Sequence, residues 1–266
     1  MTTTNIDSGT DKLLVEQRDN TLLLTINAPP ANTWDADNLS ALARVVEQAD
    51  SDSEIYAIVV TGAGEKFFSA GADLNLFASG DKTVASDMAE NFGRAFEKLS
   101  NFRGVTIAAV NGFAMGGGLE CAMACDIRIA EQQSLLALPE ATVGLLPCGG
   151  GTQNLAWLVG EGWAKRMILC GERVDANKAL EIGLVEEVVD KGAALDSALK
   201  LAQRVGKQSP PAVASCKALI QHARSGNIGA AYTTERANFV GLFDTKDQKE
   251  GVSAFLEKRE AKWVNG

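Results

Sequence analysis

The chain has 266 residues, of which 46% are hydrophobic and 22% are charged, and its formal net charge is −9. This composition is ordinary for a globular protein, and the length is sufficient for one large domain or for a domain with a helical appendage. The acidic balance, without any long basic tract, argues against duplex nucleic acid and anionic membranes as partners.

The N-terminal residues 1–11 have neither an apolar core nor an arginine, so they match neither a signal peptide nor a typical transit peptide. We expect them to form a loose tail. No apolar run approaches the roughly 20 residues of a membrane-spanning helix. The five cysteines are an odd number in a long chain, which is typical of a reduced intracellular protein, and we expect a cytoplasmic location.

Short apolar runs rich in β-branched residues predict four buried strands, at residues 21–26, 55–62, 105–112 and 127–130. Apolar residues at helical spacing predict helices around 39–46 and 85–99 between these strands. This alternation indicates an α/β fold.

From about residue 152, apolar segments that end at glycine predict a succession of helices. No segment rich in Pro, Gly or Ser separates two independent domains. We therefore expect an α/β core with the active site over residues 12–195 and a helical C-terminal region over residues 196–266.

Glycine-rich turns follow strands or open helices at TGAGEKF, FSAGADL, NGFAMGGGLE and PCGGGTQ. None contains the P-loop pattern, and the run Gly149–Gly151 lacks the last glycine of the Rossmann fingerprint. The remaining interpretation is that glycine lets a backbone N–H group approach a ligand at the positive end of a helix. Two such groups that converge on one oxygen form an oxyanion hole.

Two glutamates between these turns are embedded in apolar sequence, Glu120 in GGLECAMAC and Glu140 in LALPEATVG. Glu120 follows Gly117 by three residues and therefore shares its helix face. The single histidine, His222, lies far from every glycine-rich turn, so carboxylates are the natural acid–base groups. Cys121 and Cys125 share a helix face, but no further Cys or His completes a metal site, and we expect them to pack in the core.

At these residues the sequence resembles the enoyl-CoA hydratase (crotonase) family over roughly residues 12–262. The resemblance rests on four motifs in the family's order: FFSAGADL (67–74), NGFAMGGGLECAMACD (111–126), LPEATVGLLPCGGGTQ (138–153) and DTKDQKEGVSAFLEKR (244–259). It implies a spiral of β-β-α units followed by helices that trimerise, commonly as a dimer of trimers. It also implies an acyl-CoA thioester substrate in fatty-acid β-oxidation and no separate cofactor, since CoA is part of the substrate.

Position by position, the resemblance implies an oxyanion hole from the N–H groups of Ala72 and Gly117 and a catalytic pair formed by Glu120 and Glu140. Glu120 would hold and activate the water, and Glu140 would exchange the proton at the α-carbon. Burial and proximity should raise the pKa of at least one of these carboxyls. The implied substrate-binding positions are Ala70, Asp73, Leu74, Asn75, Gly116 and Cys148, together with Phe255 and Lys258, which would reach the CoA at a neighbouring subunit.

One departure from the family pattern is Pro147-Cys148, where hydratases usually have proline-glycine. Cysteine keeps the backbone N–H group that positions the water in the family, and it adds a side chain that narrows the pocket or serves packing alone. Retention of both glutamates favours an enoyl-CoA hydratase over a delta-isomerase or an acyl-CoA hydrolase of the same superfamily. An RNA-binding or scaffold protein is the remote alternative, and the sequence does not indicate the acyl group.

Overall fold

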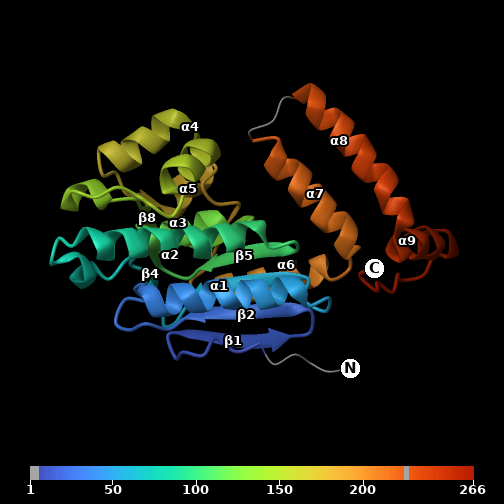
Figure 1. The fold of residues 1–266 in the computed structure, drawn as a ribbon, viewed down its shortest axis with the longest axis horizontal. Coiled ribbons are helices and arrows are strands. Elements are labelled where there is room, and N and C mark those ends of the chain that lie inside the picture. The colour runs from blue at the N-terminus through green and yellow to red at the C-terminus, as the bar shows by residue number, and fades with distance from the viewer. Residues whose placement is uncertain (1–5, 225–227) are drawn as a thin grey trace.

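The computed structural model describes residues 6–224 and 228–266 and shows a repeated order of two strands and a helix (Figure 1). The repeats comprise β1 (Leu13–Arg18), β2 (Thr21–Ile26) and α1 (Ala36–Ser51); β3 (Ala57–Gly62), β4 (Phe67–Ser69) and α2 (Lys82–Asn101); β5 (Val105–Val110), β6 (Phe113–Met115) and α3 (Gly117–Ala124); and β7 (Ile127–Glu131), β8 (Leu135–Ala137) and α4 (Gly151–Leu169). The elements that follow are β9 (Val174–Asp175), α5 (Ala176–Glu181), β10 (Glu187–Val189), α6 (Ala194–Val205), α7 (Pro210–His222), α8 (Ile228–Gly241) and α9 (Lys246–Glu257).

In the second, third and fourth repeats the first strand joins one sheet and the second strand joins another, whereas both strands of the first repeat lie in the same sheet. The larger sheet has the order β1-β2-β3-β5-β7-β10, and all of its neighbours are parallel except the antiparallel pair β1–β2. The smaller sheet has the order β4-β6-β8-β9, with β9 antiparallel to β8. The chain thus winds as a spiral of β-β-α units, as the resemblance implied.

Helix α6 covers one face of the larger sheet. Its small residues Ala194, Ala198 and Ala202 are buried against apolar side chains of β2, β3, β5 and β7. The expected boundary between core and helical region, at residue 195, falls inside this helix.

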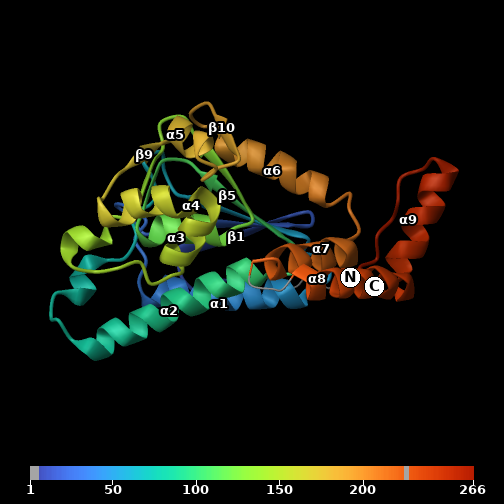
Figure 2. The ribbon, with the colours of Figure 1, turned by 90° about the horizontal axis from the view of Figure 1, so that it is seen from above.

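Helices α7, α8 and α9 project from the side of the spiral, as both views show (Figures 1 and 2). We call these three helices the C-terminal arm. Lys217 on α7 fixes the arm to the core through an ion pair with Asp126 at 2.8 Å. The guanidinium of Arg224 stacks on the ring of Trp157 in α4, with 4.0 Å between Arg224 Cζ and the ring centroid.

The four predicted strands are present as β2, β3, β5 and β7, and the two predicted helices are present as α1 and α2. Cys121 and Cys125 are buried in the main core cluster, as expected. Residues 1–5 of the expected tail lie outside the described residues. Within residues 6–11, the Ile6 side chain is buried and Arg44 donates a hydrogen bond to the carbonyl oxygen of Ser8 at 2.9 Å. None of the helices in the described ranges has the length and apolar character needed to cross a membrane.

Candidate active site

A cavity of about 740 Å³ opens where the ends of β4 and β6 meet the start of α3 and the segment after β8. We call it the catalytic cavity. Its walls are mostly apolar and contain two carboxylates and one guanidinium. The lining residues that concern the site are Ala70, Gly71, Ala72, Leu74, Phe77, Ala85, Ala89, Phe92, Gly116, Gly117, Glu120, Glu140, Val143, Leu145, Leu146, Cys148 and Arg173.

The three glycines at the start of α3 serve three different purposes. Gly116 has a φ of 52°, which a residue with a side chain rarely adopts. A Cβ on Gly117 would lie 2.7 Å from the Phe92 ring, and a Cβ on Gly118 would lie 2.2 Å from the Ser69 carbonyl oxygen. The run of glycines therefore lets α3 begin in close contact with β4 and α2.

The backbone N–H groups of Ala72 and Gly117 belong to one wall of the catalytic cavity. The N–H of Trp34 donates to Gly71 and the N–H of Asp73 donates to Trp34, so these two contacts orient the extended backbone around Ala72. Because successive residues in an extended segment point to opposite sides, the N–H of Ala72 points away from Trp34.

Gly117 is the first residue of α3, where an N–H group has no acceptor within the helix. The turn that carries Ala72 touches this helix start, because a Cβ on Gly71 would lie 3.1 Å from the Gly117 nitrogen. The two amides therefore occupy adjacent segments of one cavity wall, with the positive end of α3 behind one of them.

Glu120 is buried in the first turn of α3, and the glycine run at residues 149–151 encloses its carboxylate. The N–H groups of Gly149 and Gly151 donate to Glu120 Oε1 at 2.7 and 2.8 Å. A Cβ on Gly151 would lie 2.8 Å from the same oxygen, so glycine is required for this close approach. Oε1 of this side chain is thus held by two backbone N–H groups whose residues have no side chain in the way.

Glu140 begins a short 3-10 helix (Glu140–Val143) directly after Pro139. Its Oε1 lies 3.0 Å from the position that a Cβ on Gly116 would take, which places the carboxyl against the start of α3. Its Oε2 is buried and accepts no hydrogen bond from the described residues. Since buried polar atoms normally have a partner, this oxygen is available to a group that enters the cavity.

The pKa values of both carboxyls are raised. Burial raises the pKa of Glu120 to about 7, the N–H groups of Gly151 and Gly149 oppose this shift, and the neighbouring Glu140 adds to it. Burial also raises the pKa of Glu140. Near neutral pH such a pair can hold one proton between a donor and an acceptor, which is the state that acid–base chemistry on a carbon–carbon bond requires.

The structure brings most of the predicted site residues together. The catalytic cavity contains the four predicted catalytic positions and also Ala70, Leu74, Gly116 and Cys148. Asp73 and Asn75 are not among its lining residues, and the Asp73 carboxylate instead accepts hydrogen bonds from the N–H and the side-chain amide of Asn75.

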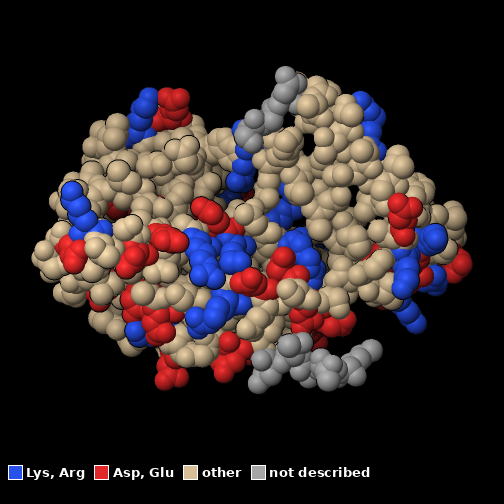
Figure 3. All heavy atoms as spheres, in the orientation of Figure 1, with Lys and Arg blue, Asp and Glu red and all other residues tan. Residues whose placement is uncertain are grey.

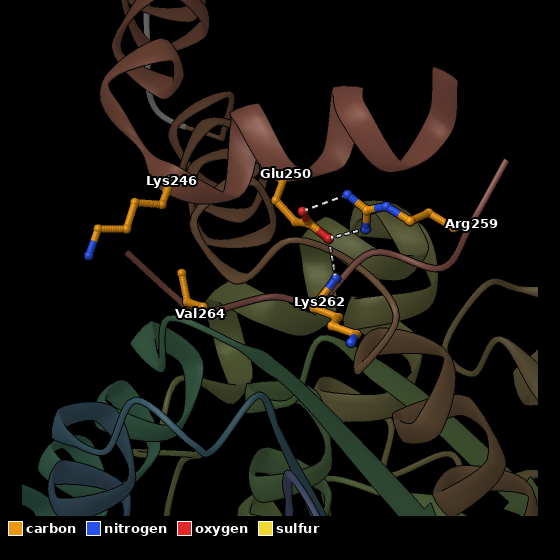
Figure 4. Close-up of a pocket in the computed structure, with 5 residues that line it drawn as sticks. All are labelled: Lys246, Glu250, Arg259, Lys262 and Val264. Atoms are coloured by element: carbon orange, nitrogen blue, oxygen red, sulfur yellow. Dashed lines mark hydrogen bonds and ion pairs between the residues drawn. The ribbon is translucent and has the colours of Figure 1, made fainter. Parts of the chain in front are cut away.

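Phe255 lies in the last turn of α9 and Lys258 directly follows this helix, and α9 lies on the C-terminal arm, away from α3 (Figures 1 and 2). Figure 4 shows a second cavity beside α9, lined by Lys246, Glu250, Arg259, Lys262 and Val264. Its cations do not converge on one point, because Arg259 pairs with Glu250 and the amine of Lys246 points away.

Sequence reasoning missed the role of Gly149 and Gly151, which hold Glu120 from 29 and 31 residues further along the chain. The glycine run PCGGGTQ indicated a close backbone approach, but the sequence did not show that Glu120 is the group approached. Arg173 was also missed, and it is the one cationic side chain among the residues that line the catalytic cavity. His222 ends α7 and is not among these lining residues.

Comparison with known proteins identifies the molecule as an enzyme. The sequence model of a family described as Enoyl-CoA hydratase/isomerase matches residues 16–266. The short-chain-enoyl-CoA hydratase of Clostridium acetobutylicum is 38% identical over 255 residues, covering 94% of this chain and 96% of that protein. The crotonyl-CoA hydratase of Syntrophomonas wolfei is 35% identical, covering 96% of this chain and 98% of that protein.

Solved structures agree with this result. The structure of Pseudomonas aeruginosa DspI superposes with a TM-score of 0.95 and 62% identity, covering 98% of this chain and 99% of that one. Enoyl-CoA hydratase from Bacillus anthracis gives a TM-score of 0.92 and 32% identity, covering 96% of this chain and 100% of that one. The chain belongs to the enoyl-CoA hydratase/isomerase family and has the crotonase fold.

Proposed function

We propose that this protein is an enoyl-CoA hydratase, a hydro-lyase that adds water across the 2,3 double bond of a 2-enoyl-CoA to give a 3-hydroxyacyl-CoA. The observation that carries the proposal is the shared cavity of two raised-pKa carboxyls, Glu120 and Glu140, and two backbone amides, those of Ala72 and Gly117. Relatives named as enoyl-CoA hydratases over nearly the whole chain support it.

The reaction follows from where charge and protons must go. As the water oxygen bonds to C3, negative charge develops on the thioester oxygen, and the N–H groups of Ala72 and Gly117 stabilise it; one such donor contributes about 3–4 kcal/mol in comparable enzymes. Ionised Glu120 accepts a proton from the water, and protonated Glu140 donates a proton to C2. One C–O bond and one C–H bond form, and solvent restores the two protonation states.

The substrate-binding role of Ala70, Asp73, Leu74, Asn75, Gly116 and Cys148 is part of this proposal. Ala70, Leu74, Gly116 and Cys148 line the catalytic cavity, and the Asp73–Asn75 turn adjoins it in sequence. CoA enters as part of the substrate, and the proposed chemistry uses no separate cofactor.

We further propose a homotrimer, or a dimer of trimers, assembled through the C-terminal arm, with Phe255 and Lys258 reaching the CoA bound to a neighbouring subunit. The 82% exposure of the Phe255 side chain and the position of α9, away from α3, support this assignment. The cytoplasmic location rests on the five unpaired cysteines, and the role in fatty-acid β-oxidation rests on the family.

The direct test adds crotonyl-CoA to the purified protein and follows the loss of the enoyl-thioester absorbance. We expect the absorbance to fall and chromatography to show 3-hydroxybutanoyl-CoA. Conversion of a 3-enoyl-CoA without hydration would instead identify an isomerase, and release of free CoA, detected with a thiol reagent, would identify a hydrolase.

A further inference from the structure

A second groove shares two lining residues with the catalytic cavity. This groove has a volume of about 910 Å³ and runs between α1 and α2, and we call it the α1–α2 groove. Its lining residues are Val46, Glu47, Asp50, Ser51, Ala89, Glu90, Gly93, Arg94, Glu97, Lys98, Asn101 and Cys148. Two of them, Ala89 and Cys148, also line the catalytic cavity, and we call this pair the junction.

The two spaces differ in character. The α1–α2 groove is lined by four acids, two bases, a serine and an asparagine, and charged side chains of both signs gather over α1 and α2 (Figure 3). Water hydrates a groove with such a charged and polar lining. The catalytic cavity is mostly apolar apart from its carboxyls. An acyl thioester that enters this cavity therefore displaces water from the opening through which the thioester enters.

The junction lies next to the groups that handle water. Both Glu120 and Glu140 act on the Cys148 thiol, whose pKa burial raises to about 11 with a further contribution from each carboxylate. The residue after Cys148 donates its N–H to Glu120. Ala89 and Cys148 therefore lie between the α1–α2 groove and the part of the catalytic cavity that contains the two carboxyls.

We propose, on the basis of the hydratase function above, that the junction of Ala89 and Cys148 is the passage through which the reacting water enters from the α1–α2 groove and, in the reverse reaction, leaves. The substrate and the water then use separate entrances. Water can exchange while the thioester stays bound.

Helix α2 offers a matched set of positions for a test. Ala85, Ala89 and Gly93 follow one another at intervals of four residues and so share a helix face. Ala85 lines only the catalytic cavity, Ala89 lines the junction, and Gly93 lines only the groove. A Cβ on Gly93 would meet only Glu97 Oε1, at 3.6 Å, so a larger side chain would extend into the groove.

The measurement uses 3-hydroxybutanoyl-CoA that carries heavy oxygen at the hydroxyl. During dehydration, mass spectrometry follows unlabelled 3-hydroxybutanoyl-CoA, formed when the released water exchanges before the enoyl-CoA departs. A trap removes the released crotonyl-CoA. The ratio of this exchange to net crotonyl-CoA release then reports how often the water escapes while the thioester is still bound. We expect Ala89→Leu to lower the ratio about tenfold, because the labelled water is retained and adds back.

The control Ala85→Leu places the same bulk in the catalytic cavity one turn away, and we expect its ratio to stay within about twofold of the unsubstituted protein while KM rises. Gly93→Leu should lower the ratio, and Cys148→Gly should raise it. Equal ratios in the Ala85→Leu and Ala89→Leu proteins would overturn the passage. Absence of any dehydration by the unsubstituted protein would instead refute the proposed hydratase function.

Discussion

At Glu120, a substitution can remove the ability to accept a proton while keeping the hydrogen bonds of the side chain. A glutamine at this position still offers an oxygen to the N–H groups of Gly149 and Gly151 but cannot accept a proton from water. We expect Glu120→Gln to lower the rate of crotonyl-CoA hydration about a thousandfold and to bind the unreactive thioester butanoyl-CoA normally by calorimetry. A near-normal rate would remove Glu120 from the mechanism.

Glu140 should be separable from Glu120 by proton exchange at C2 of butanoyl-CoA. This exchange needs a base near the α-carbon and an oxyanion hole but no attacking water. In deuterated buffer, followed by NMR, we expect exchange to be lost in Glu140→Gln and kept in Glu120→Gln. The reverse pattern would exchange the roles assigned to the two residues.

The raised pKa of Glu120 also predicts a pH dependence of stability. Its pKa is about 7 in the folded protein, against the ordinary glutamate value of 4.5, so between these pH values the folded state holds a proton that the unfolded state releases. The free energy of unfolding therefore falls as pH rises from about 4.5 to about 7, by about 3 kcal/mol from this one group.

The substitution Glu120→Gln removes this contribution. Chemical denaturation should show that Glu120→Gln is more stable than the unsubstituted protein at pH 8, with the difference shrinking toward pH 5. A difference that does not depend on pH would show that Glu120 titrates normally in the folded protein.

At the scale of the elements, the fit between α3 and β4 determines where the Gly117 amide lies. Gly118 and Gly93 are both glycines within helices, but a Cβ on Gly118 would lie 2.2 Å from a carbonyl oxygen, whereas a Cβ on Gly93 would make only an ordinary contact of 3.6 Å with Glu97 Oε1. We expect Gly118→Ala to lower the free energy of unfolding by about 3 kcal/mol or more, and Gly93→Ala to raise it by about 1 kcal/mol. Thermal denaturation of the two variants tests whether packing, and not helix propensity, requires Gly118.

The longer elements were predictable because each buries a continuous apolar face. Strands β2, β3, β5 and β7 follow from their apolar runs, whereas β4, β6 and β8 have three residues each, too few for a periodic pattern. Helix α6 was assigned to the C-terminal region because its sequence does not show that its alanines face the sheet.

The site was predictable to a different extent. Glu120 and Glu140 stand out because carboxylates are costly in apolar surroundings, and the glycines beside them indicate close backbone approach. The enclosure of Glu120 by Gly149 and Gly151 is a contact between distant segments, and no local pattern encodes it. That Ala89 and Cys148 line both cavities likewise depends on how α2 lies beside the segment after β8.

At the scale of the whole molecule, the C-terminal arm leaves a large apolar surface uncovered. Ile228, Tyr232, Phe239, Val240 and Phe243 are all more than half exposed, and few charged side chains lie over α7 and α8 on the face shown in Figure 3. A patch of this kind is typical of an interface. The ion pair of Lys217 with Asp126, which follows α3, connects the arm to the helix that carries Glu120.

The proposed assembly makes this surface testable. Phe239 is 63% exposed and packs edge-to-face only on Phe243 of its own chain among the ring contacts of the described residues. We expect Phe239→Asp to dissociate the oligomer, so that light scattering gives the mass of one chain, because an interface tolerates a buried unpaired charge poorly.

If Phe255 and Lys258 serve a neighbouring subunit, KM for crotonyl-CoA should rise on dissociation more than kcat falls. Leu14→Asp, at a 47% exposed leucine on β1, is the control that should keep the oligomer, and a fully assembled Phe239→Asp protein would place the interface elsewhere.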